Sequence, residues 1–157
     1  MPLNQFRNPT VYLLKQKNLK MKAVNVTLLF DGEAEAAFNL YKSVFGGEFS
    51  NVQRLKDMPS PEALPAEDLD KILHMSLPIG NSVVNGMDTP TGRGPVNKGN
   101  NFMVAVDTES EEETDRLFNG LAEGGEVMMP VAQQFWGAYF GMLKDKFGIQ
   151  WMLSYVK

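Results

Sequence analysis

The sequence predicts an α+β protein built from two βαβββ modules, and two observations lead to this prediction. In each half of the chain, a β-branched strand pattern is followed by a helical period of apolar residues and then by three more strand-like segments. The two halves also match at a constant spacing, because Gly46 and Gly124 lie 78 positions apart, as do Val24 and Phe102. Self-similarity at a fixed offset indicates an internal duplication.

The first half begins with a strand over residues 24–30, where β-branched and apolar side chains dominate. A helix over 33–45 follows, since its apolar residues recur on one helical face, and Gly46-Gly47 ends it. Three further strands are predicted at 49–56, 71–77 and 82–87, with a proline-rich acidic loop at 57–70 and a turn at 79–81.

The second half repeats this order from a strand over residues 102–106. Ser110 and Glu113 form a capping box that starts the next helix, and Gly124-Gly125 ends it. Its three further strands are predicted at 126–133, 138–144 and 149–155. The resulting organisation is an N-terminal extension (1–22), a first module (23–88), a linker (89–100) and a second module (101–157).

Composition excludes several kinds of site. The 157 residues include no cysteine and a single histidine, His74. Without cysteine the chain has no disulfide, iron–sulfur cluster, thiolate zinc site or cysteine nucleophile. One histidine prevents a single chain from building a three-His zinc site or a two-His iron site. His74 is therefore the only candidate histidine base, and no catalytic residue is assigned.

Charge and hydropathy limit the classes of partner that the protein is expected to bind. The net charge of −4 argues against binding a nucleic-acid backbone, which requires a basic face. Residues 1–22 carry +5, whereas the rest of the chain has 10 basic and 19 acidic residues. The apolar run at 11–14 is too short for a signal peptide, and no stretch reaches the length of a membrane span. We expect a cytoplasmic protein without membrane or nucleic-acid partners. The basic segment is a disordered arm, a docked arm or an artefact of start choice, with Met21 as the alternative start.

Four motifs stand out within residues 21–157. They are Phe30-Asp31-Gly32 and the segments 41–48, 72–77 and 135–148. Together with the duplicated βαβββ unit, they resemble the PhnB-like branch of the vicinal oxygen chelate superfamily, which includes glyoxalase I, bleomycin-resistance proteins and extradiol dioxygenases. This branch often bears the name of a demethylubiquinone methyltransferase domain. The resemblance implies one open, barrel-like mixed sheet with a cleft (the glyoxalase/bleomycin resistance fold) and a homodimer.

The resemblance also implies a divalent metal, held by His or Gln on the first strand of a module and by Glu on the last. The matching first-strand positions here are Asn25 or Thr27 in one module and Met103 or Ala105 in the other, and the expected glutamate is Met152. None is a good ligand, so we expect no metal and no cofactor. The methyltransferase name implies a Gly-rich loop that opens a helix, whereas the glycine pairs of this sequence end helices.

We predict that the protein binds a small apolar or aromatic ligand in the cleft. Alternation along strand 71–77 places His74 with Ile72 and Ser76 on one face, and Leu73, Met75 and Leu77 on the core face. Trp136 and Trp151 would stack on a flat ligand, and an amide from Gln133 or Gln134 would supply a polar contact. The predicted ligand-binding residues are His74, Gln133, Gln134, Phe135, Trp136, Tyr139 and Trp151.

Alternatives remain at this stage. His74 also fits a structural histidine, and the aromatic residues and methionines also fit ordinary core packing. Two other function classes stay open: a metal-dependent lyase, isomerase or dioxygenase with atypical ligands, and an interaction protein without a ligand.

Overall fold

The computed structural model describes residues 22–157, so all but the last residue of the predicted N-terminal extension lies outside the described residues. The first half contains β1 (Val26–Phe30), α2 (Ala34–Phe45), β2 (Asn51–Arg54), β3 (Ile72–Ile79) and β4 (Ser82–Asp88). The second half contains β5 (Val104–Asp107), α3 (Glu111–Ala122), β6 (Glu126–Gln133), β7 (Ala138–Lys144) and β8 (Gln150–Val156). Short 3₁₀ turns occupy Leu55–Asp57, Pro61–Ala63, Ala66–Asp68 and Thr91–Arg93.

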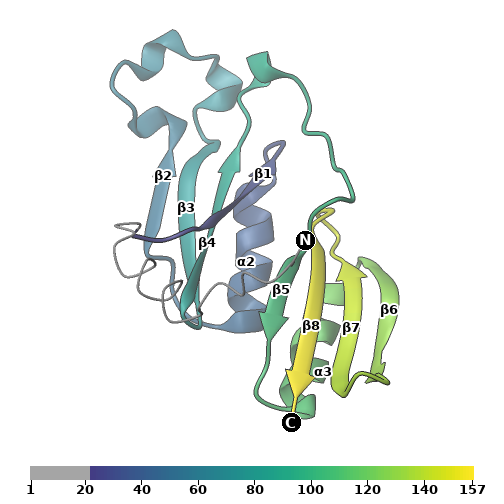
Figure 1. Ribbon diagram of the computed structural model, residues 1–157. Helices are drawn as coiled ribbons and strands as arrows, with labels where there is room; N and C mark the ends of the chain where they lie inside the picture. Colours follow the sequence, from purple (N-terminus) through teal and green to yellow (C-terminus); the bar gives the residue numbers. More distant parts are fainter. Residues whose placement is uncertain (1–21) are drawn as a thin grey trace, which may run out of the picture.

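Each half folds into a four-stranded mixed sheet with the same strand order. The orders are β1-β4-β3-β2 and β5-β8-β7-β6 (Figure 1). In both sheets the first strand runs parallel to the last, and the other pairs are antiparallel. The predicted fold class of two βαβββ modules is confirmed. Among residues 22–157, no hydrogen-bonded ladder joins the two sheets, so the barrel is unclosed there.

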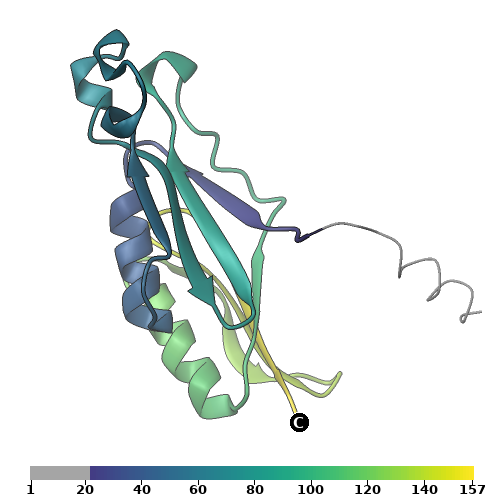
Figure 2. The same cartoon turned by 90° about the vertical axis from the view of Figure 1, so that its left-hand side faces the viewer.

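Both helices cover the same side of the two sheets. Figure 2 shows α2 above α3 on that side, and the opposite face of each sheet has no α-helix from the described residues over it. We call this opposite face the helix-free face. The helices and sheets share one apolar core, whose largest members are Phe30, Phe38, Tyr41, Phe118 and Trp151. Within residues 22–157, no helix is both long and apolar enough to cross a membrane.

The two helices start in different ways. Ser110 accepts a hydrogen bond from the Glu113 amide at 3.1 Å, as the predicted capping box requires. Helix α2 lacks a side-chain cap of its own. Instead, the buried Asp88 carboxylate accepts from the Ala34 amide at 3.0 Å and from the Ile72 amide at 2.9 Å. Because Asp88 ends β4, it ties the start of the helix to the sheet.

A buried carboxylate connects the two halves of the molecule. Asp145, in the turn between β7 and β8, is only 3 % exposed. It accepts from the Tyr41 hydroxyl at 2.7 Å and from Trp151 Nε1 at 2.9 Å, and two backbone amides of its own turn complete the set. Burial, together with the negative charge of Asp145, raises the pKa of Tyr41. The hydroxyl therefore stays a donor, and Tyr41 of α2 is linked to the second half.

Strand β3 departs from simple alternation. The register pairs Gln53 with His74 but Arg54 with Ile72, so the ladder skips Leu73. Such a bulge shifts the following residues to the other face. Ile72 consequently lies in the core, 1 % exposed, beside Met75 and Leu77. The prediction that Ile72 shares the face of His74 is wrong.

Candidate functional site

The helix-free face of the first sheet presents a row of four uncharged polar side chains. Thr27 on β1 pairs with Asn85 on β4, Asn85 pairs with Ser76 on β3, and Ser76 pairs with Asn51 on β2. On β1, β4 and β3 the core includes the strand neighbours Leu28, Val84, Met75 and Leu77, so this row points away from the core. We call these four residues the polar row.

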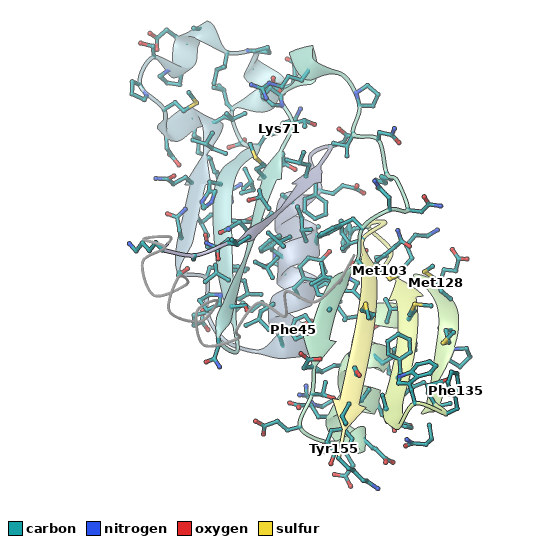
Figure 3. All side chains as sticks on the ribbon, viewed as in Figure 1. Phe45, Lys71, Met103, Met128, Phe135 and Tyr155 are labelled. Atoms are coloured by element: carbon teal, nitrogen blue, oxygen red, sulfur yellow. The ribbon has the colours of Figure 1, made fainter. Side chains whose placement is uncertain are left out.

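The second sheet carries a row at the equivalent positions, and its chemistry is opposite. Ala105 on β5 pairs with Met152 on β8, Met152 with Met142 on β7, and Met142 with Met129 on β6. Ala105 lies 78 positions after Thr27, the same offset as the repeat. We call these four residues the methionine row. Figure 3 shows sulfur atoms gathered over this part of the sheet.

Hydrogen bonds orient the polar side chains of the first sheet. The Ser76 hydroxyl donates to Asn85 Oδ1 at 2.7 Å. The Asn51 amide nitrogen lies 2.9 Å from His74 Nδ1 and 3.4 Å from the His74 carbonyl. Because a carbonyl only accepts, the second contact identifies the amide nitrogen as the donor in both. His74 Nδ1 is therefore an acceptor, and the ring proton lies on Nε2.

A groove of about 610 Å³ lies where the two sheets meet. Asn25 and Val83 line it from the first sheet, and Met103 and Ala105 line it from the second. Its volume lies within the usual range for small-molecule sites. Because these four residues belong to the helix-free faces, the groove adjoins both of them. A smaller hollow of about 240 Å³ lies between β1 and the linker.

An aromatic hairpin borders the methionine row. The turn between β6 and β7 presents Phe135, 97 % exposed, and Trp136, 53 % exposed, with their rings 4.9 Å apart (Figure 3). Trp136 also contacts Phe140 in an edge-on arrangement at 5.8 Å. Phe140 lies two residues before Met142 on β7 and so shares its face. The hairpin thus extends the apolar surface outward.

The other predicted ligand-binding residues are less accessible to a ligand on the helix-free face. Trp151 lines the groove, but its side chain is fully buried. The Tyr139 hydroxyl donates to Asp115 of α3 at 2.8 Å, which places Tyr139 on the helix side. Gln133 pairs with Tyr139 and shares that side, and the Gln134 amide bonds to a carbonyl of its own hairpin. We therefore do not carry these four residues into the proposed site.

The predicted residues do not converge on one small pocket. His74 lies on β3 of the first sheet, whereas Phe135 and Trp136 lie in the hairpin at the outer edge of the second (Figure 1). The sequence did not identify Asn51 and Asn85 as candidate site residues. Period-two alternation indicates which residues of one strand share a face, but only the register shows which residues of different strands are neighbours.

The two rows include positions where the resemblance implies a metal. Of the positions expected for it, Thr27, Ala105 and Met152 belong to the rows. Asn85 pairs with Thr27 as Met152 pairs with Ala105, so it is the equivalent of Met152 in the first sheet. Divalent metals of this chemistry prefer imidazole and carboxylate ligands, and the Asn85 oxygen already accepts from Ser76. The residues do not fit such a centre. Within residues 22–157, no three His, Asp or Glu side chains lie close enough to hold an ion.

Comparison with known proteins agrees with the fold. The model of the family described as 3-demethylubiquinone-9 3-methyltransferase matches residues 22–154. Protein PA1353 from Pseudomonas aeruginosa is 33 % identical, with a TM-score of 0.78, over 87 % of this chain and 98 % of that one. The PhnB protein from Bacillus cereus is 27 % identical, with a TM-score of 0.66, over 86 % of this chain and all of that one.

A more distant structure shows the fold alone. A glyoxalase/bleomycin resistance protein/dioxygenase family enzyme from Burkholderia phytofirmans is 17 % identical, with a TM-score of 0.57. The match covers 85 % of this chain and 97 % of that one.

Proposed function

The chain belongs to the 3-demethylubiquinone-9 3-methyltransferase (PhnB) family and has the glyoxalase/bleomycin resistance fold, and from this premise we propose a function in binding. The protein takes up a small, partly apolar or aromatic ligand on its helix-free face, without a divalent metal. The observation that carries this proposal is the content of the two rows. The positions at which the superfamily would bind a metal hold amide, hydroxyl and thioether groups instead.

Binding is favoured over catalysis because the face lacks an activated group. His74 is hydrogen bonded to an amide, Asn51, and not to a carboxylate that would orient it as a base. Retention of the ligand is then the activity, as in sequestration by a resistance protein. The groove of about 610 Å³ and the apolar surface beside it provide the space for a small ligand.

Methyl transfer is not part of this proposal, although the family name includes it. A methyl-donor site of the usual kind needs a Gly-rich loop between a strand and the helix that follows it. The connection from β1 to α2 contains a single glycine, Gly32, and the glycine pairs follow the helices. Addition of S-adenosylmethionine should therefore leave the melting temperature unchanged.

Elemental analysis and a ligand screen test the proposal together. We expect no stoichiometric Ni, Zn, Mn or Fe in the purified protein, and stabilisation by aromatic compounds in a thermal-shift screen. Trp136→Ala should abolish the stabilisation. Tyr139→Ala, which removes an aromatic ring from the helix side of the same hairpin, should leave it intact. A stoichiometric metal that is lost in His74→Ala would instead support a metal-dependent lyase, isomerase or dioxygenase. A screen without any binder would support an interaction protein.

We also propose a homodimer. The edge strand β6 exposes Val127 at 48 % and Met128 at 43 % near its start, and the hairpin at its other end exposes Phe135 and Trp136. A second copy would remove this apolar surface from water. Light scattering after size exclusion should give about twice the chain mass of 17.5 kDa, and Phe135→Ser should weaken the dimer. A monomer at all micromolar concentrations would contradict the proposal.

A cytoplasmic location is proposed as well. The absence of cysteine is compatible with a reducing compartment. Cell fractionation would test this location, and recovery of the protein in a membrane or extracellular fraction would contradict it.

A further inference from the structure

We infer that the ligand is an uncharged amphipathic molecule, with a flat apolar part that lies on the methionine row and a carbonyl or hydroxyl group that faces the polar row. The inference rests on the proposed function and names the class of ligand. It follows from three features of the helix-free face: the end-to-end order of the rows, the absence of charge in them, and the hydrogen-bonding groups that they leave open.

The two rows are arranged end to end across the molecule. Thr27 lies on the edge strand β1 and Ala105 lies on the edge strand β5, so these residues are the inner ends of the two rows. The groove runs between the two strands and is lined by Asn25, Met103 and Ala105. Both rows alternate with core residues along their strands, so they belong to the helix-free face. Within each sheet the strands lie about 4.8 Å apart, so each row of four residues extends about 14 Å outward from the groove.

Neither row carries a charge. Charged side chains line the groove at one end, where Asp107 ends β5, Glu109 follows it, and Glu113 and Arg116 of α3 pair with each other at 3.8 Å. His74 Nδ1 accepts a hydrogen bond from the Asn51 amide at 2.9 Å, so the ring is held by an uncharged partner. A charged ligand group placed over the rows would lose hydration without gaining an opposite charge. The face therefore selects an uncharged ligand.

Two hydrogen-bond donors on the helix-free face of the first sheet are open. Asn85 Oδ1 is occupied by the Ser76 hydroxyl, which leaves the Asn85 amide nitrogen as its donor. The proton of His74 lies on Nε2, because Asn51 donates to Nδ1. In the described part of the chain, neither nitrogen has an acceptor. These donors match a ligand oxygen, such as that of a ketone, a quinone-type carbonyl or a hydroxyl.

The methionine row supplies the apolar half of the site. Met129, Met142 and Met152 are each partly exposed, and Phe140 lies beside them. Thioether side chains are flexible and polarizable, and they make favourable contacts with aromatic rings. A flat ring placed on this row therefore finds an adaptable surface, and Trp136 closes the row at the hairpin.

Three naphthalene probes test this assignment by calorimetric titration of the full chain. 2-Acetylnaphthalene is neutral and has a carbonyl, naphthalene has no polar group, and 2-naphthoate is anionic. We expect the ketone to bind about tenfold more tightly than either of the other two, the change that one well-placed hydrogen bond produces. Naphthalene that binds as tightly as the ketone, or naphthoate that binds most tightly, overturns the inference and leaves the proposed function standing.

Variants separate the two halves of the site. Asn85→Leu should lower ketone affinity about tenfold, to the naphthalene level, and leave naphthalene binding unchanged. Asn51→Leu, at a less buried position, is the second variant and should also lower the preference for the ketone. Met142→Gln should weaken both neutral probes about tenfold, whereas Met58→Gln, in a distant loop, should weaken neither. Equal effects of the two Met→Gln changes contradict the inference. If no probe binds the unmodified protein, both the proposed function and the inference fail.

Discussion

The buried hydrogen bond between the two modules offers a quantitative test of the packing. Tyr41 donates to Asp145 Oδ2 at 2.7 Å, and the two residues are 0 % and 3 % exposed. A hydrogen bond to a charged group contributes about 1.5–3 kcal/mol, and water has no access here to replace the lost donor. Tyr41→Phe should therefore lower the free energy of unfolding by about 2 kcal/mol. For a chain of this length, that corresponds to a melting temperature lower by about 4–8 °C.

Urea unfolding monitored by tryptophan fluorescence provides the assay, and Tyr139→Phe is the matched control. Tyr139 also donates to a carboxylate, Asp115, at 2.8 Å, but this bond lies at the surface. Its loss should cost less than about 0.5 kcal/mol, as for most surface substitutions. Equal losses in the two variants would refute the reasoning that burial strengthens the Tyr41 bond. A Tyr41→Phe variant as stable as the unmodified protein would refute it as well.

Two further substitutions test the packing and the electrostatics of the first module. Gly86→Ala should destabilise the protein by about 1–3 kcal/mol in urea unfolding, because the added carbon would lie 2.3 Å from the Phe38 ring. Gly92→Ala, with open space around it, should change stability by less than about 0.5 kcal/mol, and equal effects would contradict this account. The hydrogen bond from Lys71 holds the pKa of Asp68 below its ordinary value, so its stabilisation is present above about pH 4 and is lost as the pH falls through the folded-state pKa. The stability difference between Asp68→Asn and the unmodified protein should therefore shrink from pH 6 to pH 3, and a difference independent of pH would contradict it.

Local sequence patterns predicted most of the elements correctly. The helix that starts after Ser110 begins where its capping box indicates, and strands β6 and β7 have the predicted bounds. These features depend on residues close together in the chain, such as a cap three residues from its partner or apolar residues one helical turn apart. Reading along the chain is sufficient for such signals.

The site was predicted less well, because it depends on contacts between distant residues. Trp151 was expected in the cleft, and it lines the groove between the sheets. Alternation within β8 does not show that its side chain is fully buried or that its Nε1 donates to Asp145. Ile72 was misplaced because a bulge in β3 is a property of the pairing with β2. Asn51 and Asn85 gave no signal on their own, since only the register joins them to Ser76.

The composition and the internal repeat of the sequence were sufficient to predict the duplicated α+β modules and to exclude thiolate chemistry, because residue counts and spacings can be read directly from the sequence. The sequence also showed that the expected metal positions lack suitable ligands. Tertiary structure decided what those positions form together. Strand register aligned Thr27, Asn85, Ser76 and Asn51 into a polar row, and it aligned Ala105 with three methionines. Neighbours across a sheet are set by pairing between strands, which are far apart in the chain, and therefore only the folded molecule shows them.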